Sequence, residues 1–299
     1  MVQVPPAGPH GGDGQNIARA LGIDLSQILD LSQSLNPFVP HLEAVVAQRL
    51  NSLRHYPDPT EPAALLANTL GVESQRVLLT NGASEAIWLV HTEIGGRVWA
   101  EPEFGLHPRN PRGPIWRSDP HNPSGCLAGP NEVADVWDEA FYPLATGRWT
   151  SQRTGVIVGS LTKTFACPGL RLGYIIADEV QRFARHQPQW PTNSLALAVL
   201  VDLLDLADLS RWATDITTAR QELAGLFELF GFSVVVADAP WILVQAPGLR
   251  ERLAPHGVVV RNCSSFGMPE HVRVGIPDSD GLARLHSAII TSGIKAKSG

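Results

Sequence analysis

Apolar and polar positions alternate in a helix-and-strand pattern through the first two thirds of the chain. Between residues 41 and 208, helical periodicity alternates with short apolar runs, among them Val98–Ala100, Val156–Gly159 and Leu172–Ala177. Short apolar runs separated by helices are typical of a mostly parallel sheet buried by helices on both faces. We therefore expect a large α/β domain over residues 41–208, with ligands beyond the carboxyl ends of its strands.

The pattern changes after an amphipathic stretch over Leu209–Leu229. The apolar runs that follow are rich in β-forming residues and are separated by turn-like breaks: Phe232–Val236, Ile242–Val244, Val258–Arg261 and Val272–Gly275. This pattern predicts a smaller α+β domain over residues 209–299.

The first forty residues differ from both domains. Many prolines and glycines exclude regular structure there, apart from a short helix expected over Gln15–Leu21. Asn36-Pro37 and Pro40 favour an extended exit from the segment. Residues 1–40 are therefore predicted to form an arm that packs with the small domain.

Composition and charge narrow the classes of partner. The 299 residues include 23 Lys and Arg against 29 Asp and Glu, a net charge of −6 with no basic stripe. Nucleic acid and anionic membranes are therefore not expected as partners. The apolar run Leu195–Val201 is far shorter than the ~20 residues that cross a bilayer, so we expect a soluble cytoplasmic protein. Cys126, Cys167 and Cys263 lie far apart, which predicts buried thiols and no metal site.

The segment from Val156 to Tyr174 carries the strongest chemical signal. An apolar strand ends in the hydroxyls of Ser160 and Thr162 and in Lys163, and Arg171 follows eight residues later. A desolvated lysine loses its proton more readily than the ordinary value of ~10.4 and can attack a carbonyl carbon. The hydroxyls and the guanidinium supply the donors that a phosphate dianion requires.

The string Ser-Leu-Thr-Lys-Thr-Phe-x-x-Pro-Gly-Leu-Arg-Leu-Gly-Tyr resembles the lysine motif of the fold type I aminotransferases, which use pyridoxal 5′-phosphate. It is most similar to the branch that contains the histidinol-phosphate aminotransferases and the threonine-phosphate decarboxylases. The resemblance implies a fold type I transferase in which Lys163 bonds covalently to the cofactor and Arg171 binds its phosphate. Ser160 and Thr162 join the implied cofactor-binding residues.

Two further motifs concern the cofactor's phosphate. Gly82, Ala83 and Ser84 follow an apolar run and open a helix, where free amide N–H groups can surround an anion. They resemble the phosphate-binding Gly-Ala-Ser-Glu pattern of the family. Tyr56, in a Tyr-Pro-Asp-Pro string, resembles the tyrosine that reaches the cofactor phosphate of the neighbouring subunit. This implies a homodimer with shared active sites.

Three motifs concern the cofactor's ring. Asn122, in Asn-Pro-Ser-Gly, resembles the asparagine that meets the ring hydroxyl. Asp138, in Asp-Glu-Ala-Phe, resembles the carboxylate at the pyridine nitrogen, which keeps the ring protonated as an electron sink. The family's next aromatic position falls on Phe141. The residue that stacks on the ring falls on or near His107, with Phe104 as the other candidate.

The chain is short for this family, and the missing part can be located. Asn122 follows His107 by only fifteen residues, through a proline-rich segment that cannot be helical, and the interval from Gly125 to Asp138 is compressed as well. A shortened large domain is therefore expected. It leaves open a homologue with weak or no catalysis.

The substrate residues are assigned by the same resemblance. Arg273 is assigned to the substrate carboxylate and Arg261 to its other anionic end, since a guanidinium binds either group through paired hydrogen bonds. His10, Gly11 and Asn36 lie in arm segments that resemble those of the threonine-phosphate decarboxylases. A phosphorylated amino acid is the implied substrate.

Three functions follow from these assignments. The first is the decarboxylation of L-threonine O-3-phosphate to (R)-1-amino-2-propanol phosphate, a step of cobalamin biosynthesis. The second is the transamination of a compound of the histidinol-phosphate type. The third is a trimmed homologue without turnover.

Overall fold

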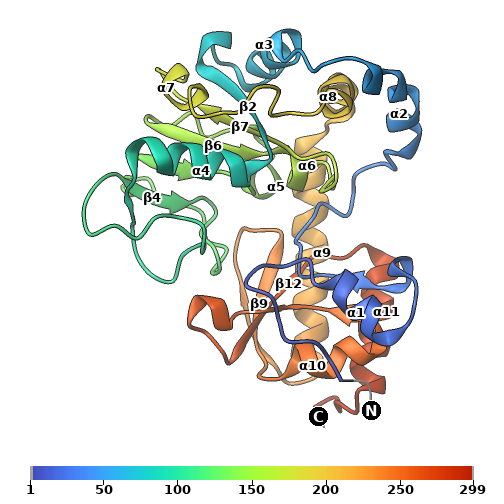
Figure 1. Cartoon of the computed structure of the whole chain (residues 1–299). Helices are drawn as coiled ribbons and strands as arrows, with labels where there is room; N and C mark the ends of the chain where they lie inside the picture. The colour runs from blue at the N-terminus through green and yellow to red at the C-terminus, as the bar shows by residue number, and fades with distance from the viewer. Residues whose placement is uncertain (1–2, 298–299) are drawn as a thin grey trace.

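The computed structural model describes residues 3–297 and forms two lobes (Figure 1). A six-stranded sheet lies in the upper lobe of the figure and a four-stranded sheet in the lower lobe. The long helix α9 (Leu209–Leu229) runs between them and has the bounds that the amphipathic pattern predicts. Both ends of the described chain lie at the lower lobe.

The large sheet has the strand order β2-β7-β6-β5-β4-β3. The four strands β6, β5, β4 and β3 are parallel to one another, whereas β7 is antiparallel to both of its neighbours, β2 and β6. The expected mostly parallel sheet is therefore confirmed. The strands are β2 (Val77–Asn81), β3 (Arg97–Val98), β4 (Ile115–Ser118), β5 (Val136–Asp138), β6 (Val156–Ser160) and β7 (Leu172–Ile176).

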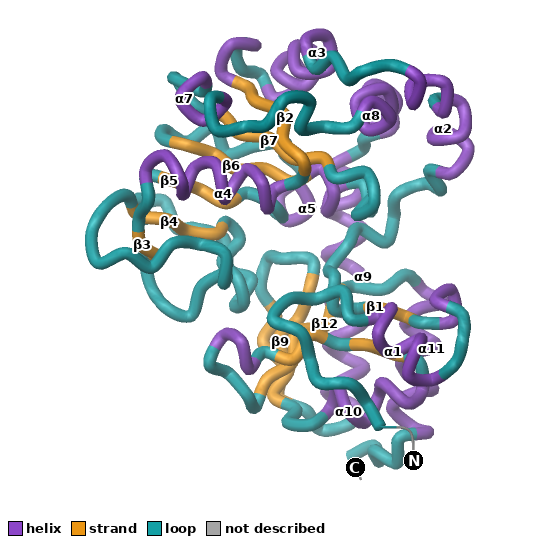
Figure 2. Tube along the Cα trace, in the orientation of Figure 1, coloured by secondary structure: helices purple, strands orange, loops and turns teal. Residues whose placement is uncertain are grey.

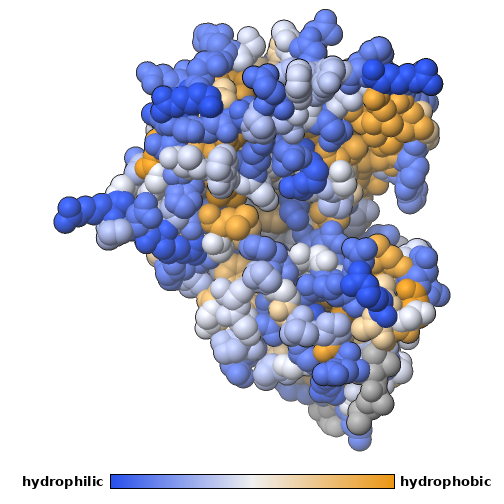
Figure 3. Space-filling view, viewed as in Figure 1, coloured by the Kyte–Doolittle hydropathy of each residue, from blue (hydrophilic) through white to orange (hydrophobic). Residues whose placement is uncertain are grey.

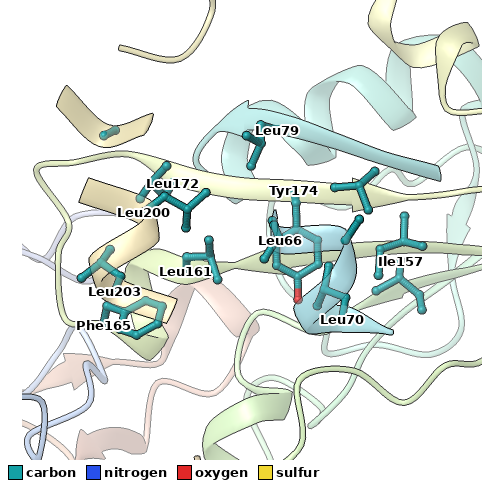
Figure 4. Packing of buried hydrophobic residues seen from close by; sticks show 14 of the residues in the cluster. Leu66, Leu70, Leu79, Ile157, Leu161, Phe165, Leu172, Tyr174, Leu200 and Leu203 are labelled. Carbon is teal, nitrogen blue, oxygen red and sulfur yellow. The ribbon is translucent and has the colours of Figure 1, made fainter. Parts of the chain in front are cut away.

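Helices cover both faces of this sheet because its strands are apolar on both sides. Leu66 and Leu70 of α3 and Leu200 of α8 pack with Ile157 and Tyr174 on one face (Figure 4). The opposite face packs against α4 and α7. The helices of this lobe are α2 (Glu43–Gln48), α3 (Thr60–Leu70), α4 (Ala83–Ile94), α5 (Tyr142–Thr146), α6 (Leu161–Thr164), α7 (Gln181–Ala184) and α8 (Ser194–Leu206).

The shortening of the large domain is visible in two crossovers. Segments 99–114 and 119–135 join parallel strands and, within the described residues, contain no helix, although such crossovers usually carry one (Figure 2). Charged side chains cover the sheet there instead. The Arg153 guanidinium lies 4.2 Å from the centre of the Trp137 ring and pairs with Asp119, and Arg117 pairs with Glu132 at 2.7 Å.

The lower lobe contains an antiparallel sheet of order β11-β12-β9-β8. The arm joins this lobe through β1 (Leu29–Asp30), which pairs in parallel with β10 (Val258–Val259). Its helix α1 (Gly14–Leu21) begins one residue before the expected helix. The other elements are β8 (Ser233–Val236), β9 (Trp241–Gln245), β11 (Arg261–Asn262), β12 (His271–Gly275), α10 (Leu249–Leu253) and α11 (Ser279–Thr291). We propose the domain boundaries 1–40, 41–208 and 209–299 because each lobe has its own hydrophobic core.

One cysteine differs from the sequence prediction. Cys167 and Cys263 are buried, but Cys126 is exposed because it lies in the helix-free crossover 119–135. Among residues 3–297, no helix combines the length and apolar character needed to cross a membrane.

A close cross-strand contact makes one glycine of the large sheet irreplaceable. A Cβ atom at Gly159 would lie 2.0 Å from the ring of Tyr174, its cross-strand partner. We expect Gly159→Ala to lower the free energy of unfolding by ~1–3 kcal/mol through overpacking. A Cβ atom at Gly225 in α9 would meet no described atom within 4 Å outside the backbone of its own helix. Gly225→Ala should therefore raise the free energy of unfolding by ~0.5–1 kcal/mol. Urea unfolding measures both, and equal effects would contradict this packing.

Candidate active site

A cavity of about 340 Å³ lies at the carboxyl ends of β4, β5 and β6, where the sheet topology predicts a ligand. Residues from both lobes and from the arm line it. Most of the predicted site residues are among them: His10, Gly11, Ala83, Ser84, Asn122, Asp138, Phe141, Ser160, Thr162, Lys163, Arg171, Arg261 and Arg273.

One end of the cavity has the donors that a phosphate requires. A Cβ atom at Gly82 would lie 2.4 Å from Nη2 of Arg171, so only glycine lets this guanidinium approach the start of α4. Ala83 and Ser84 form the first turn of α4, where the backbone N–H groups have no partner within the helix. Within residues 3–297, Arg171 makes only long hydrogen bonds of 3.4 and 3.5 Å to backbone carbonyls, so its donors can turn to an anion.

Lys163 lies directly after β6 in the short helix α6. Its Nζ donates a hydrogen bond to the carbonyl oxygen of Gln33 in the arm at 3.0 Å. Burial, together with the charges of Arg273 and Arg171 and against the opposing effect of Asp30, lowers the pKa of Lys163 to about 8. About a tenth of this amine is therefore neutral at pH 7, far more than for an ordinary lysine, and this neutral form is the nucleophile that the sequence predicts.

Asp138 ends β5 and directs its carboxylate into the cavity. Its Oδ1 accepts a hydrogen bond from the backbone N–H of Ala140 at 3.0 Å, and its Oδ2 lies 3.0 Å from Nε2 of His107. The side chain is only 6% exposed. The carboxylate is therefore fixed from two sides and can meet a protonated ring nitrogen.

The assignment of His107 as the residue that stacks on the ring is wrong in this structure. Its side chain is fully buried and lies behind Asp138, to which it is bonded. Phe104, the other candidate from the sequence, lines the cavity and packs edge-on against His107 with 5.6 Å between ring centres.

Asn36 is buried and directed away from the cavity, contrary to its assignment as a substrate residue. Its backbone N–H donates to the carbonyl oxygen of Lys163 at 3.2 Å, and its side-chain amide donates to that of Thr164 at 3.0 Å. Asn36 therefore holds the turn that carries the lysine.

Tyr56 is 77% exposed and stacks on Trp190 with 4.4 Å between ring centres. It lies outside the residues that line the cavity of its own chain. We therefore propose that Tyr56 reaches the cavity of a neighbouring subunit.

The two arginines that the resemblance assigns to the substrate stand directly opposite each other on neighbouring strands, Arg261 on β11 and Arg273 on β12. Nη1 of Arg273 donates to Oδ1 of Asn122 at 2.7 Å, while its buried Nε has no hydrogen-bond partner among the described residues. Burial lowers the pKa of Arg273 to about 10. An anion in the cavity would offset the cost of burying this charge.

Arg261 ties the arm to this position. Its guanidinium donates to the carbonyl oxygens of Gly8 and Pro9 and to Oγ of Ser265. His10 follows in the arm, where burial and the charge of Arg261 lower its pKa, and its ring centre lies 5.8 Å from that of Phe104. The arm therefore lines the cavity together with residues of the two lobes.

Some cavity residues were not found from the sequence. Gln33 acts through its backbone carbonyl, which leaves no signal in the side-chain pattern. Ser118 could have been found, because it ends an apolar strand of the sheet. Phe266 could have been found from its place in the string around Arg261.

A lysine of lowered pKa, a helix start with free N–H groups and a buried carboxylate lie together here, and these are the groups that a pyridoxal-phosphate enzyme needs. Residues 109–289 match the family model "Aminotransferase class I and II". The chain belongs to this family, and its cofactor is pyridoxal 5′-phosphate.

Relatives and solved structures agree with this membership. The chain is 25% identical to histidinol-phosphate aminotransferase 1 of Dechloromonas aromatica, over 91% of this chain and 92% of that one. It is 27% identical to histidinol-phosphate aminotransferase 2 of Pseudomonas aeruginosa, over 88% and 89%.

Two solved structures show the shared fold. L-threonine-O-3-phosphate decarboxylase from Porphyromonas gingivalis aligns with a TM-score of 0.75 at 21% identity, covering 90% of this chain and 100% of that one. Histidinol-phosphate aminotransferase from Sinorhizobium meliloti, in complex with pyridoxal-5′-phosphate, aligns with a TM-score of 0.76 at 16% identity, covering 97% and 95%. The fold type I architecture is thereby confirmed.

The lowered pKa of Lys163 predicts how covalent capture of the cofactor depends on pH. Only the neutral amine attacks the cofactor's aldehyde, so the capture rate should rise with pH, with a midpoint near 8 in place of the ordinary 10.5. Arg273→Met removes one charge that lowers this pKa and should move the midpoint upward. Borohydride trapping followed by peptide mass spectrometry measures the capture.

Two variants control this experiment. Lys163→Ala should remain folded and trap no cofactor, whereas Lys295→Ala, which changes an exposed lysine, should trap it as the wild type does. Trapped cofactor in Lys163→Ala would mean that another amine is the attachment site.

Proposed function

We propose that this chain decarboxylates L-threonine O-3-phosphate to (R)-1-amino-2-propanol phosphate. The observation that carries the proposal is the cross-strand pair Arg261 and Arg273 beside Lys163. Two guanidinium groups on adjacent strands suit a compact substrate with two anionic groups a few bonds apart. Threonine phosphate has such a carboxylate and phosphate, whereas histidinol phosphate has one phosphate and an imidazole ring.

The residues at the cavity fit the cofactor. Arg171 with the first N–H groups of α4 would hold its phosphate, Asp138 its ring nitrogen, and Phe104 one face of its ring. Asn122, Ser160, Thr162 and Phe141 complete the proposed binding residues. When bound, the protonated ring withdraws electrons from the bonds at the substrate's α-carbon.

The side chains that bind the substrate would determine which bond at its α-carbon breaks. Arg273 binds the carboxylate while Arg261, with His10 and Gly11 of the arm, binds the phosphate. Holding both ends of the substrate allows its carboxylate to be turned out of the plane of the ring, which is the orientation that decarboxylation needs. The amine of Lys163 lies in the same cavity, and in its protonated form it would return a proton to the α-carbon.

A transaminase is the second candidate. The names of the relatives favour it, since the two quoted above are histidinol-phosphate aminotransferases. Such an enzyme would leave the carboxylate in place and remove the α-hydrogen. Both candidates need the same cofactor site, so only the products separate them.

The exposed apolar surface supports a homodimer, which we place in the cytoplasm because no signal segment is expected from the sequence. Leu50 and Leu53, with Val201 and Leu206 of α8, are exposed, and Figure 3 shows an apolar patch beside α2 and α8. Tyr56 and Trp190 lie exposed in the same lobe. Covering this patch with a second copy would bring Tyr56 toward the partner's cavity.

Sedimentation tests the dimer. The wild type should sediment as a dimer, and Leu53→Glu should shift it toward monomer, because a charge would be buried in the interface. Val133→Glu changes an equally exposed residue outside the patch and should leave the dimer intact. A monomeric wild type would contradict the shared site.

Product analysis tests the reaction. With threonine phosphate the purified holoenzyme should release carbon dioxide, with little activity on unphosphorylated threonine. Losing one charge-assisted anion contact typically costs ~1.5–3 kcal/mol, so Arg261→Gln should lower kcat/KM for the phosphorylated substrate by roughly one to two decades. Release of no carbon dioxide, together with conversion of histidinol phosphate and 2-oxoglutarate, would establish the transaminase instead.

A further inference from the structure

The loop between β3 and β4 carries two side chains on which the cofactor site depends. Phe104 lines the cavity, and His107 is bonded to Asp138. Both residues lie in the helix-free crossover 99–114. A loop without regular hydrogen bonds cannot fix two side chains by itself, so other groups must hold it.

Glu103 supplies that support from inside the protein. Its carboxylate, 1% exposed, accepts a hydrogen bond from the backbone N–H of Phe104 at 2.8 Å. It also accepts hydrogen bonds from the backbone N–H and from Oγ of Ser118 at 3.0 and 2.6 Å. One buried side chain thus joins the loop to the end of β4, where Ser118 lines the cavity.

The same carboxylate faces the imidazole that holds Asp138. Oε1 of Glu103 lies 3.9 Å from Nδ1 of His107, a buried atom without a hydrogen-bond partner in residues 3–297. Oε2 lies 3.9 Å from Nε2 of His121. His107 is therefore placed between two carboxylates, Asp138 at one ring nitrogen and Glu103 at the other.

Arg109 supports the outer side of the loop. Its guanidinium donates to the carbonyl oxygens of Glu103, Phe104 and His107 at 2.9, 2.8 and 2.5 Å. It also pairs with the exposed carboxylate of Glu101 at 2.9 Å. Side chains therefore provide the backbone partners that a helix would otherwise supply.

We propose that Glu103 is a positioning residue of the cofactor site, which acts through Phe104 and His107 in place of a crossover helix. The carboxylate sets where the Phe104 ring lies against the cofactor. Its charge also faces Nδ1 of the imidazole that orients Asp138, at a distance of 3.9 Å. This inference rests on the proposed roles of Phe104 and Asp138.

The test is Glu103→Gln in the full-length protein. Glutamine keeps the length, but one of its two terminal atoms becomes a donor and cannot accept from the groups around it. We expect the dissociation constant for pyridoxal 5′-phosphate to rise about ten- to hundredfold, as lost hydrogen bonds to a buried charge typically cause. The visible circular dichroism of the bound cofactor should weaken, because its ring is held less rigidly.

Glu179→Gln is the control. It makes the same change of charge on an exposed side chain outside the β3–β4 loop, and should change the dissociation constant by no more than about twofold. Glu103→Asp keeps the charge but shortens the reach. It should give an intermediate dissociation constant, and it replaces Glu103→Gln if that variant does not fold.

A purely structural role for Glu103 would give a different result. It would lower the free energy of unfolding and leave the dissociation constant and the dichroism of the folded protein at wild-type values, which would overturn the proposal. A wild type that traps no cofactor at Lys163 would refute the proposed function instead. The two failures are therefore distinguishable.

Discussion

The hydrogen bond between His107 and Asp138 connects the two parts of the chain that the cofactor site needs most. Asp138 ends a central strand, while His107 belongs to a crossover without a helix. Because both side chains are buried, neither can be left without a partner at low cost. The loop conformation, the place of Phe104 and the direction of the Asp138 carboxylate therefore depend on one another.

The small domain and the arm impose the second constraint. Arg273 is buried with a free Nε, and Arg261 stands opposite it with its donors on the arm. Two buried cations side by side are unfavourable until an anion binds between them. The charge of Arg273 also lowers the pKa of Lys163, so this proposed substrate residue also helps to prepare the nucleophile.

The sequence predicts the elements and most of the cavity, because helical periodicity and the lysine motif are local signals. It predicts α9 to the residue, and it predicts that the segment after His107 has no helix. The sequence places His107 and Asn36 at the ligand, but the structure bonds them to Asp138 and Thr164. Those contacts come from tertiary packing, which no local pattern shows. Gln33 acts through a backbone atom and Glu103 through three hydrogen bonds, so neither carries a local signal.

The most direct test of the account is a crystal structure of the protein loaded with pyridoxal 5′-phosphate. The phosphate should lie between Arg171 and the first turn of α4, and the ring nitrogen should meet Asp138. Phe104 should lie against the ring, and His107 should remain behind the carboxylate. A ring stacked on His107, or cofactor bound away from Lys163, would contradict the central claim that this shortened chain keeps a complete cofactor site.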